Sequence, residues 1–166
     1  MKLLLVRHAT AVPRGTSGVS DDDRPLTPEG KTRFLAAARG LARIAHRPDV
    51  LLTSPLPRAR VTAEIVAGVF TDLDLTVEPA LARGDVDAVV AAVENQPAGS
   101  TVALVGHEPL LGTLLARLLG AKPDHGLAFK KGGVALVDLP DGLRGAGRLV
   151  WFVEPRILRI VAGHTA

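Results

Sequence analysis

The chain has 166 residues with 47% hydrophobic and 3% aromatic side chains, and this length predicts a single domain spanning residues 1–166. Scattered Lys and Arg with a net charge of +3 and few aromatic side chains argue against nucleic-acid binding, and the absence of cysteine excludes disulfides, thiolate metal sites and a cysteine nucleophile. No apolar segment reaches the length of a membrane span or of a signal-peptide core, so we expect a cytoplasmic protein without a membrane partner.

The chain begins with an apolar run that predicts a buried strand over Lys2–Arg7. The following segment, Ala9–Leu26, is rich in Gly, Ser, Asp and Pro and has no hydrophobic period. A loop of this length is usually functional or mobile. Thr27 then offers an N-cap and Pro28 a first helical position, which predicts an amphipathic helix ending before Pro48.

The rest of the chain alternates between apolar strands and helices, followed by a terminal hairpin. The further predicted strands are Val50–Ser54, Leu75–Val77, Thr101–Val105, Val134–Leu139 and Leu149–Val153, and the further helices are Pro57–Val69, Val86–Val93 and Pro109–Leu119. Strand–helix alternation predicts an α/β fold: a three-layer α/β/α sandwich with a mostly parallel central sheet. Pro140-Asp141-Gly142 predicts a turn between the last two strands and hence an antiparallel C-terminal portion.

Three of the predicted strands end in polar, reactive side chains. Arg7-His8 follows the first strand, Ser54 ends the second, and His107 follows the strand at Thr101–Val105. Ligands of open parallel sheets bind at the carboxyl ends of the strands, and Arg58 can turn back toward that edge. Arginine offers a planar fork of donors to phosphate, and histidine alternates between nucleophile, base and acid, so this set predicts phosphoryl chemistry. An isolated Arg-His pair is usually just a polar strand end. The prediction therefore depends on two histidines and two arginines meeting at the same edge of the sheet.

The same residues resemble the three motifs of the histidine phosphatase superfamily. These motifs are Arg7-His8-Ala9, Ser54-Pro55-Leu56-Pro57-Arg58-Ala59 with Thr62-Ala63, and Gly106-His107-Glu108-Pro109. Arg24-Pro25-Leu26-Thr27 with Gly30 and the small size make the chain most similar to the SixA-like branch, which is associated with phosphohistidine phosphatase activity. The resemblance implies a phosphoglycerate mutase-like fold.

The resemblance also implies a role for each motif residue. His8 would be the nucleophile that becomes a phosphohistidine, which water then hydrolyses. Arg7 and Arg58 would clamp the phosphate oxygens, and His107 would donate a further hydrogen bond to the phosphoryl group. Protein cations would supply the countercharge, so neither a metal nor another cofactor is expected. Adjacent arginines also favour the neutral form of His8 that can attack.

Two further residues are candidates for substrate binding, each with a structural alternative. Ser54 either donates to phosphate or caps the helix after Pro55. Arg24 either borders the site or forms a surface salt bridge. The carboxylates of Asp21-Asp22-Asp23 are interpreted as solvated charge rather than as metal ligands.

The chain departs from the family pattern at two places. Ala9 stands where many members have glycine, and its methyl group predicts an altered local turn. The usual acidic residue after the third strand is missing, which leaves Asp85 as the nearest possible general acid, although Asp85 also sits where a helix N-cap is expected. A phosphoramidate can be protonated on nitrogen before it leaves and needs less help from an acid than an alkoxide does.

We therefore expect a metal-independent phosphatase that forms a phosphohistidine at His8 and acts on a phosphorylated protein, with protein phosphohistidine as one substrate, or on a small phosphorylated metabolite. The alternatives are a small-molecule phosphomonoesterase, which would require a working acid such as Asp85, and a non-catalytic module that binds phosphate or a phosphopeptide. A mutase is less expected because the chain lacks long insertions. The sequence makes no prediction of an oligomeric state.

Overall fold

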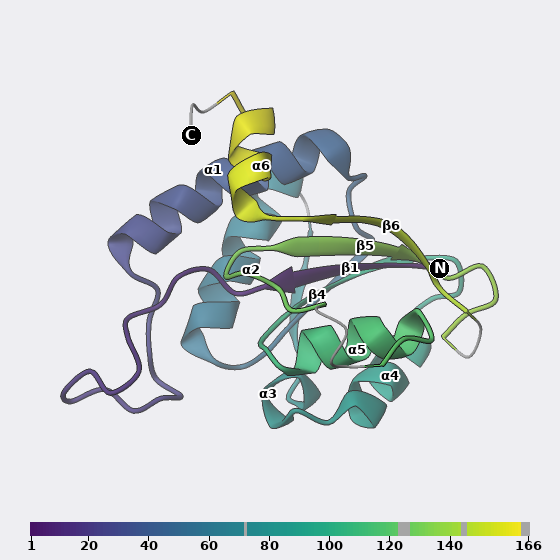
Figure 1. Ribbon diagram of the computed structural model, residues 1–166, viewed down its shortest axis with the longest axis horizontal. Coiled ribbons are helices and arrows are strands. Elements are labelled where there is room, and N and C mark those ends of the chain that lie inside the picture. Colours follow the sequence, from purple (N-terminus) through teal and green to yellow (C-terminus); the bar gives the residue numbers. More distant parts are fainter. Residues whose placement is uncertain (72, 123–126, 144–145, 164–166) are drawn as a thin grey trace.

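The central element of the fold is a six-stranded mixed sheet with helices on both faces (Figure 1). A computed structural model describes residues 1–71, 73–122, 127–143 and 146–163. The described strands are β1 (Lys2–Arg7), β2 (Val50–Thr53), β3 (Leu75–Val77), β4 (Thr101–Gly106), β5 (Val134–Asp138) and β6 (Arg148–Val153). Their order is β3-β2-β4-β1-β5-β6, with the first four parallel and the last two antiparallel. This confirms the predicted α/β sandwich and its antiparallel C-terminal portion.

The helices match the predicted positions to within about two residues, as expected for helix ends. They are α1 (Pro28–Ile44), α2 (Pro57–Phe70), α3 (Ala80–Arg83), α4 (Val86–Glu94), α5 (Leu110–Leu118) and α6 (Pro155–Val161). Helices α3 and α6 were not predicted from the sequence, because segments of four and seven residues are too short for a helical hydrophobic period. Among the described residues, no helix is both long enough and apolar enough to cross a membrane.

Alternating side chains of the strands form two hydrophobic cores, one on each face of the sheet. Leu4 and Val6 of β1 pack with α1, α2 and α6, whereas Leu3 and Leu5 pack with α3, α4 and α5. Figure 1 shows α1 and α6 above the sheet and α3, α4 and α5 below it. Because successive side chains of β1 point to opposite faces of the sheet, this one strand contributes to both hydrophobic cores.

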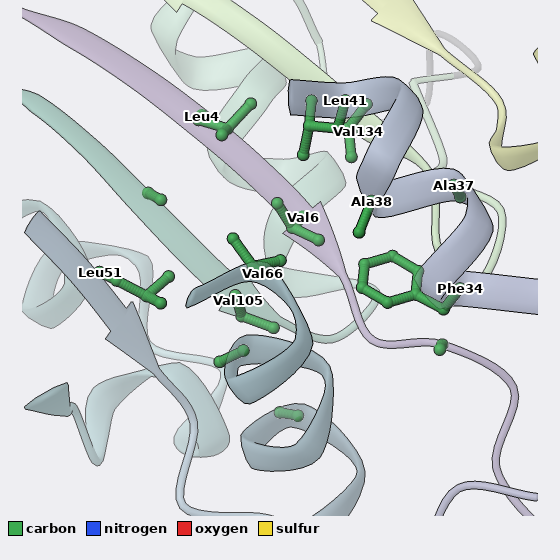
Figure 2. Packing of buried hydrophobic residues seen from close by; sticks show 14 of the residues in the cluster. Leu4, Val6, Phe34, Ala37, Ala38, Leu41, Leu51, Val66, Val105 and Val134 are labelled. Atoms are coloured by element: carbon green, nitrogen blue, oxygen red, sulfur yellow. The ribbon is translucent and has the colours of Figure 1, made fainter. Parts of the chain in front are cut away.

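The core under α1 relies on small residues that allow close packing. Figure 2 shows Phe34, Ala38 and Leu41 of α1 lying over the sheet near Val6 and Val134. At Gly40 any Cβ would collide with the backbone of Leu158, so the glycine is what allows α6 to cross so closely over α1. These contacts fix α1, and with it the C-terminal side of the loop that follows β1.

The long segment between β1 and α1 is closed at its base. An antiparallel bridge joins Ala11 to Leu26, and the amide of Val12 donates to the carbonyl of Pro25 at 3.0 Å. Thr27 caps α1 by accepting from the amide of Gly30 at 2.9 Å, as its N-cap pattern predicts. The segment thus projects from the carboxyl edge of the sheet as a closed loop rather than as a loose connection (Figure 1).

Candidate active site

The three predicted strand ends lie on adjacent strands, β2, β4 and β1. Arg7 is opposite Gly106 in the register of β1 and β4, and the amide of His8 donates to the Gly106 carbonyl at 3.0 Å. The amide of Ser54 donates to the carbonyl of Val105 at 3.0 Å. Parallel strands end at one edge, so residues about fifty positions apart in sequence meet there.

His8 is buried with one ring nitrogen committed to the backbone. Its Nδ1 lies 2.7 Å from the carbonyl oxygen of Ala9. A carbonyl oxygen can only accept, so Nδ1 carries a proton and the neutral ring has a free lone pair on Nε2. Burial lowers the pKa of His8 to about 3; the Ala9 hydrogen bond opposes this shift, and the nearby His107, Arg58 and Arg7 lower the pKa further. His8 is therefore a neutral imidazole at pH 7 with Nε2 available as a nucleophile.

His107 lies beside His8, with ring centroids 5.0 Å apart. Its Nε2 lies 2.8 Å from Oγ of the fully buried Ser54, and this Oγ accepts a hydrogen bond from the amide of Leu56 at 3.3 Å. Burial, followed by the positive charges of Arg58 and Arg7, lowers the pKa of His107 to about 4. Ser54 thus supports the turn that leads into α2 and holds the second histidine.

Two arginines complete the site, each held through one nitrogen of its guanidinium. Arg7 Nη1 donates to the carbonyl of Phe129, and Arg58 Nη1 donates to the carbonyls of Asp21 at 2.8 Å and Asp22 at 3.3 Å. Burial lowers the pKa of both arginines, although the carboxylate of Glu108 raises that of Arg7.

Several buried nitrogens of this site have no hydrogen-bond partner. Among the described residues, four buried side-chain polar atoms are unpartnered, namely Arg7 Nε, Arg58 Nε, His107 Nδ1 and Ser100 Oγ. Three of the four belong to the residues around His8. Since unpaired buried donors are costly, such a cluster favours an anionic ligand that supplies acceptors.

Arg24 is buried and serves the long loop. Its Nε donates to Asp21 Oδ1 at 2.9 Å and its Nη1 donates to the carbonyl of Val12 at 2.9 Å. Arg24 thus forms an ion pair with Asp21, and its positive charge also lowers the pKa of His107 and Arg58. Asp21 is held by Arg14 and Arg24, and its backbone carbonyl rather than its carboxylate reaches Arg58. Within the described residues, no group of three or more His or acidic side chains is arranged to hold a metal ion.

Two of the sequence expectations concerned local geometry. Ala9 is buried, and Thr71 is the one non-glycine residue with positive φ among the described residues, so the methyl group of Ala9 causes no strained turn. Position 9 therefore does not adopt the left-handed backbone that would require glycine. Asp85 is exposed and caps α4, accepting from the amide of Ala88 at 3.1 Å. Its capping interpretation is confirmed.

Two residues to which the sequence pattern assigned no role, Thr62 and Glu108, hold the site together. The buried hydroxyl of Thr62 accepts from the amide of Ala9 at 3.0 Å and donates to the carbonyl of Arg58 at 2.7 Å. Glu108 Oε1 accepts from the amide of Phe129 at 2.7 Å, while the Phe129 carbonyl accepts from Arg7. Both residues stand inside the quoted motifs, but Ala9 and Phe129, the partners that connect them to the site, lie far away in sequence.

This fold, with two imidazoles and two guanidiniums at the carboxyl ends of the parallel strands of a mixed sheet, defines the class of α/β phosphatases that use histidine. The chain belongs to the histidine phosphatase superfamily (branch 1), whose family model matches residues 3–87. The predicted superfamily and phosphatase activity are confirmed.

Full-length similarities agree with this family. The chain is 37% identical over 153 residues to an uncharacterised protein from Picosynechococcus sp. (strain ATCC 27264 / PCC 7002 / PR-6), covering 90% of this chain and 88% of the relative. It is similar to the protein histidine phosphatase SixA in complex with tungstate, with a TM-score of 0.78, 30% identity and coverage of 95% and 99% of the two chains. A proposed phosphohistidine phosphatase SixA from Agrobacterium tumefaciens matches with a TM-score of 0.77, 25% identity and coverage of 93% and 97%. These similarities confirm the SixA-like branch and the phosphoglycerate mutase-like fold.

Proposed function

We propose that this protein is a phosphohistidine phosphatase that works through a covalent phosphohistidine at His8. The observation that carries the proposal is the cluster of unpartnered buried nitrogens on Arg7, Arg58 and His107 around a neutral His8. A phosphoryl group supplies several strong acceptor oxygens and negative charge, which this cluster lacks. The resemblance to SixA supports the same reaction.

In the proposed first step, the Nε2 lone pair of His8 attacks phosphorus while the bond to the leaving nitrogen of the substrate breaks. The phosphoryl group is then on Nε2, and the positive charge that develops on the ring is shared with the Ala9 carbonyl through the Nδ1 proton. In the second step a water oxygen attacks phosphorus, the bond to Nε2 breaks, and orthophosphate leaves. The second step returns His8 to its neutral form, and both protons of the attacking water stay with the orthophosphate or pass to solvent.

The arginines and His107 are assigned to charge stabilisation in both steps. Arg7 and Arg58 have their Nη1 atoms held by backbone carbonyls, so their remaining N–H groups are fixed in direction before substrate arrives. Such preorganised donors are the main source of catalysis in phosphoryl transfer. We assign His107 Nδ1 as a further donor, with the Ser54 hydroxyl donating to Nε2 and so placing the ring proton on Nδ1.

The proposed leaving group is the imidazole of a phosphohistidine rather than an alkoxide. An alkoxide requires a general acid, and Asp85 is exposed with Oδ1 engaged in capping α4. A phosphoramidate nitrogen can be protonated before it departs and needs no such residue. The phosphomonoesterase alternative is therefore not favoured. Arg24 is proposed to act on binding indirectly, by holding the loop whose carbonyls orient Arg58.

A trapping experiment tests the nucleophile. The protein is incubated with radiolabelled phosphoramidate and denatured, and the label is expected to be acid-labile and base-stable, as a phosphohistidine is. The variant His8→Ala should remain unlabelled, while His46→Ala, which removes a histidine far from the motifs, should label like the wild type. Label that persists in His8→Ala would overturn the assignment.

A second comparison tests the leaving group. Asp85→Asn keeps the capping oxygen, so it should hydrolyse phosphohistidine and an aryl phosphate at the wild-type rate. An alkyl phosphate should be a poor substrate of both proteins. If the wild type hydrolyses the alkyl ester well and Asp85→Asn loses that activity alone, the phosphomonoesterase alternative is correct.

A further inference from the structure

A groove of about 220 Å³ lies next to His8 on the side of α1 and α6. Its floor includes Ala9 and Thr10, directly after His8 in the chain. Its other polar side chains are all cationic, and none of the described residues that line it is acidic; the cations are Arg33, Lys130, Lys131 and Arg159. We call this groove, with those four cations, the basic groove.

Two of the four cations have no ion-pair partner among the described residues. Arg33 pairs with Glu29 and Lys130 pairs with Glu154, each at 2.8 Å and with exposed side chains. Exposed pairs of this kind contribute little and exchange easily. Lys131 and Arg159 form no ion pair, so the basic groove retains positive charge that is not neutralised within the described chain.

The basic groove is tied to the nucleophile through the backbone. The amide of Gly132, which lines the groove, donates to the carbonyls of both Arg7 and His8 at 3.1 Å. Gly132 has a φ of +78°, and a Cβ there would press on Phe34, so the turn requires glycine. The segment that carries Lys130 and Lys131 is therefore fixed against the chain at His8.

The groove does not include the residues of the phosphoryl site. His8, Arg58 and His107 do not line the groove, whereas Ala9 and Thr10, which follow His8 in the chain, do. A ligand that reaches both His8 and the groove must extend past Ala9 and Thr10, which suits a segment of a protein better than a small metabolite.

We propose that the basic groove receives acidic side chains that flank the phosphohistidine of a protein substrate. This proposal rests on the proposed phosphohistidine phosphatase activity and specifies the substrate as a protein with acidic residues beside its phosphohistidine. Two uncompensated cations beside the site would attract Asp or Glu of the substrate, mainly strengthening productive encounter and binding. The chemical step at His8 would be unaffected.

Two matched phosphohistidine peptides test the proposal, one with glutamates flanking the phosphohistidine and the other with glutamines. Free phosphohistidine serves as the small substrate. For the wild type, kcat/KM should be about threefold to tenfold higher on the acidic peptide, mostly through KM, and the preference should shrink as salt is added. The double variant Lys131→Gln/Arg159→Gln should lose the preference and hydrolyse free phosphohistidine normally.

Lys31→Gln/Arg156→Gln is the control, because it removes the same charge from exposed positions of α1 and α6 that do not line the groove. It should keep the preference. The role of the basic groove would be overturned by equal kcat/KM on both peptides in the wild type, or by an equal loss of the acidic-peptide preference in both double variants. Neither result would contradict phosphohistidine hydrolysis itself. If the wild type hydrolyses neither the peptides nor free phosphohistidine, the proposed function fails and this proposal with it.

Discussion

The hydroxyl of Thr62 accepts the amide hydrogen of Ala9 at 3.0 Å and so connects α2 to the residue that follows the proposed nucleophile. Ala9 in turn accepts the Nδ1 proton of His8 through its carbonyl. Because the same hydroxyl donates to the carbonyl of Arg58, one buried side chain joins the backbones that carry His8 and Arg58. The relative position of these two residues therefore depends on Thr62.

Thr62→Val should weaken both stability and turnover. The valine has nearly the same shape but leaves the buried amide of Ala9 without an acceptor, which costs about 1–3 kcal/mol of unfolding free energy. Because the His8 loop loses its anchor, kcat should fall more than KM changes. Urea unfolding and steady-state kinetics with free phosphohistidine measure the two effects.

Thr62→Ser should keep most of the unfolding free energy and of kcat, since serine retains the hydroxyl. Thr32→Val is the matched control: Thr32 also donates to a carbonyl four residues earlier in a helix, but it is exposed and far from His8 in sequence. If Thr62→Val retains wild-type kcat, Thr62 has no positioning role.

Glu108→Gln should reduce phosphate affinity. Its carboxylate accepts from the amides of Phe129 at 2.7 Å and Gly112 at 3.3 Å, and a glutamine can accept from only one side of this pair with its single oxygen. Displacement of Phe129 would release the carbonyl that holds Arg7. We expect KM and the inhibition constant of orthophosphate to rise about threefold to thirtyfold. The exposed Glu64→Gln on α2 should change neither, and unchanged phosphate inhibition in Glu108→Gln would refute the connection to Arg7.

The stability of the protein should fall as the pH decreases from about 6.5 toward 4. The folded state lowers the pKa of His8 to about 3 and of His107 to about 4, whereas an unfolded histidine titrates near 6.5. In this window the unfolded chain binds more protons than the folded one, so each histidine lowers the unfolding free energy by up to about 1.4 kcal/mol per pH unit. The loss is complete only below the folded pKa.

Urea unfolding of the wild type and of His8→Asn across this range measures the contribution of one histidine. The variant should show a shallower pH dependence, with the two curves converging in slope above about pH 7. Parallel curves from pH 7 to 4 would contradict the lowered pKa of His8.

Gly30→Ala and Gly68→Ala should have opposite effects on stability. A Cβ at Gly30 would collide with the carbonyl oxygen of Thr10, so alanine must push α1 away from the chain that follows His8, at a cost of about 1–3 kcal/mol. Gly68 lies inside α2 with open space around its Cβ position, and alanine there should stabilise by about 0.5–1 kcal/mol. Thermal and urea unfolding of both variants check the signs, and a stable Gly30→Ala protein with full activity would show that α1 moves freely.

The sequence alone was sufficient to predict the sheet, its parallel and antiparallel parts, and the strand ends that carry the site. Buried strands such as Lys2–Arg7 and Thr101–Val105 are continuous apolar runs bounded by turn residues, and the strands in the structure coincide with these runs. The helix caps at Thr27 and Asp85 were also predictable, because a cap acts on amides two or three residues away. The short α3 and α6 were missed since their stability comes from packing rather than from their own pattern.

Only the tertiary structure decided how the site is held and which atoms are free. Nδ1 of His8 is hydrogen-bonded, and Nε2 is left free, because the carbonyl of Ala9 points toward Nδ1. Contacts across the fold make Phe129 the partner of Arg7, Asp21 the partner of Arg58 and Thr62 the partner of Ala9. Residue types and spacing specify which groups a chain possesses, because those are local properties. Hydrogen-bond partners, burial and the resulting pKa shifts are properties of the space between distant segments, and only their packing determines them.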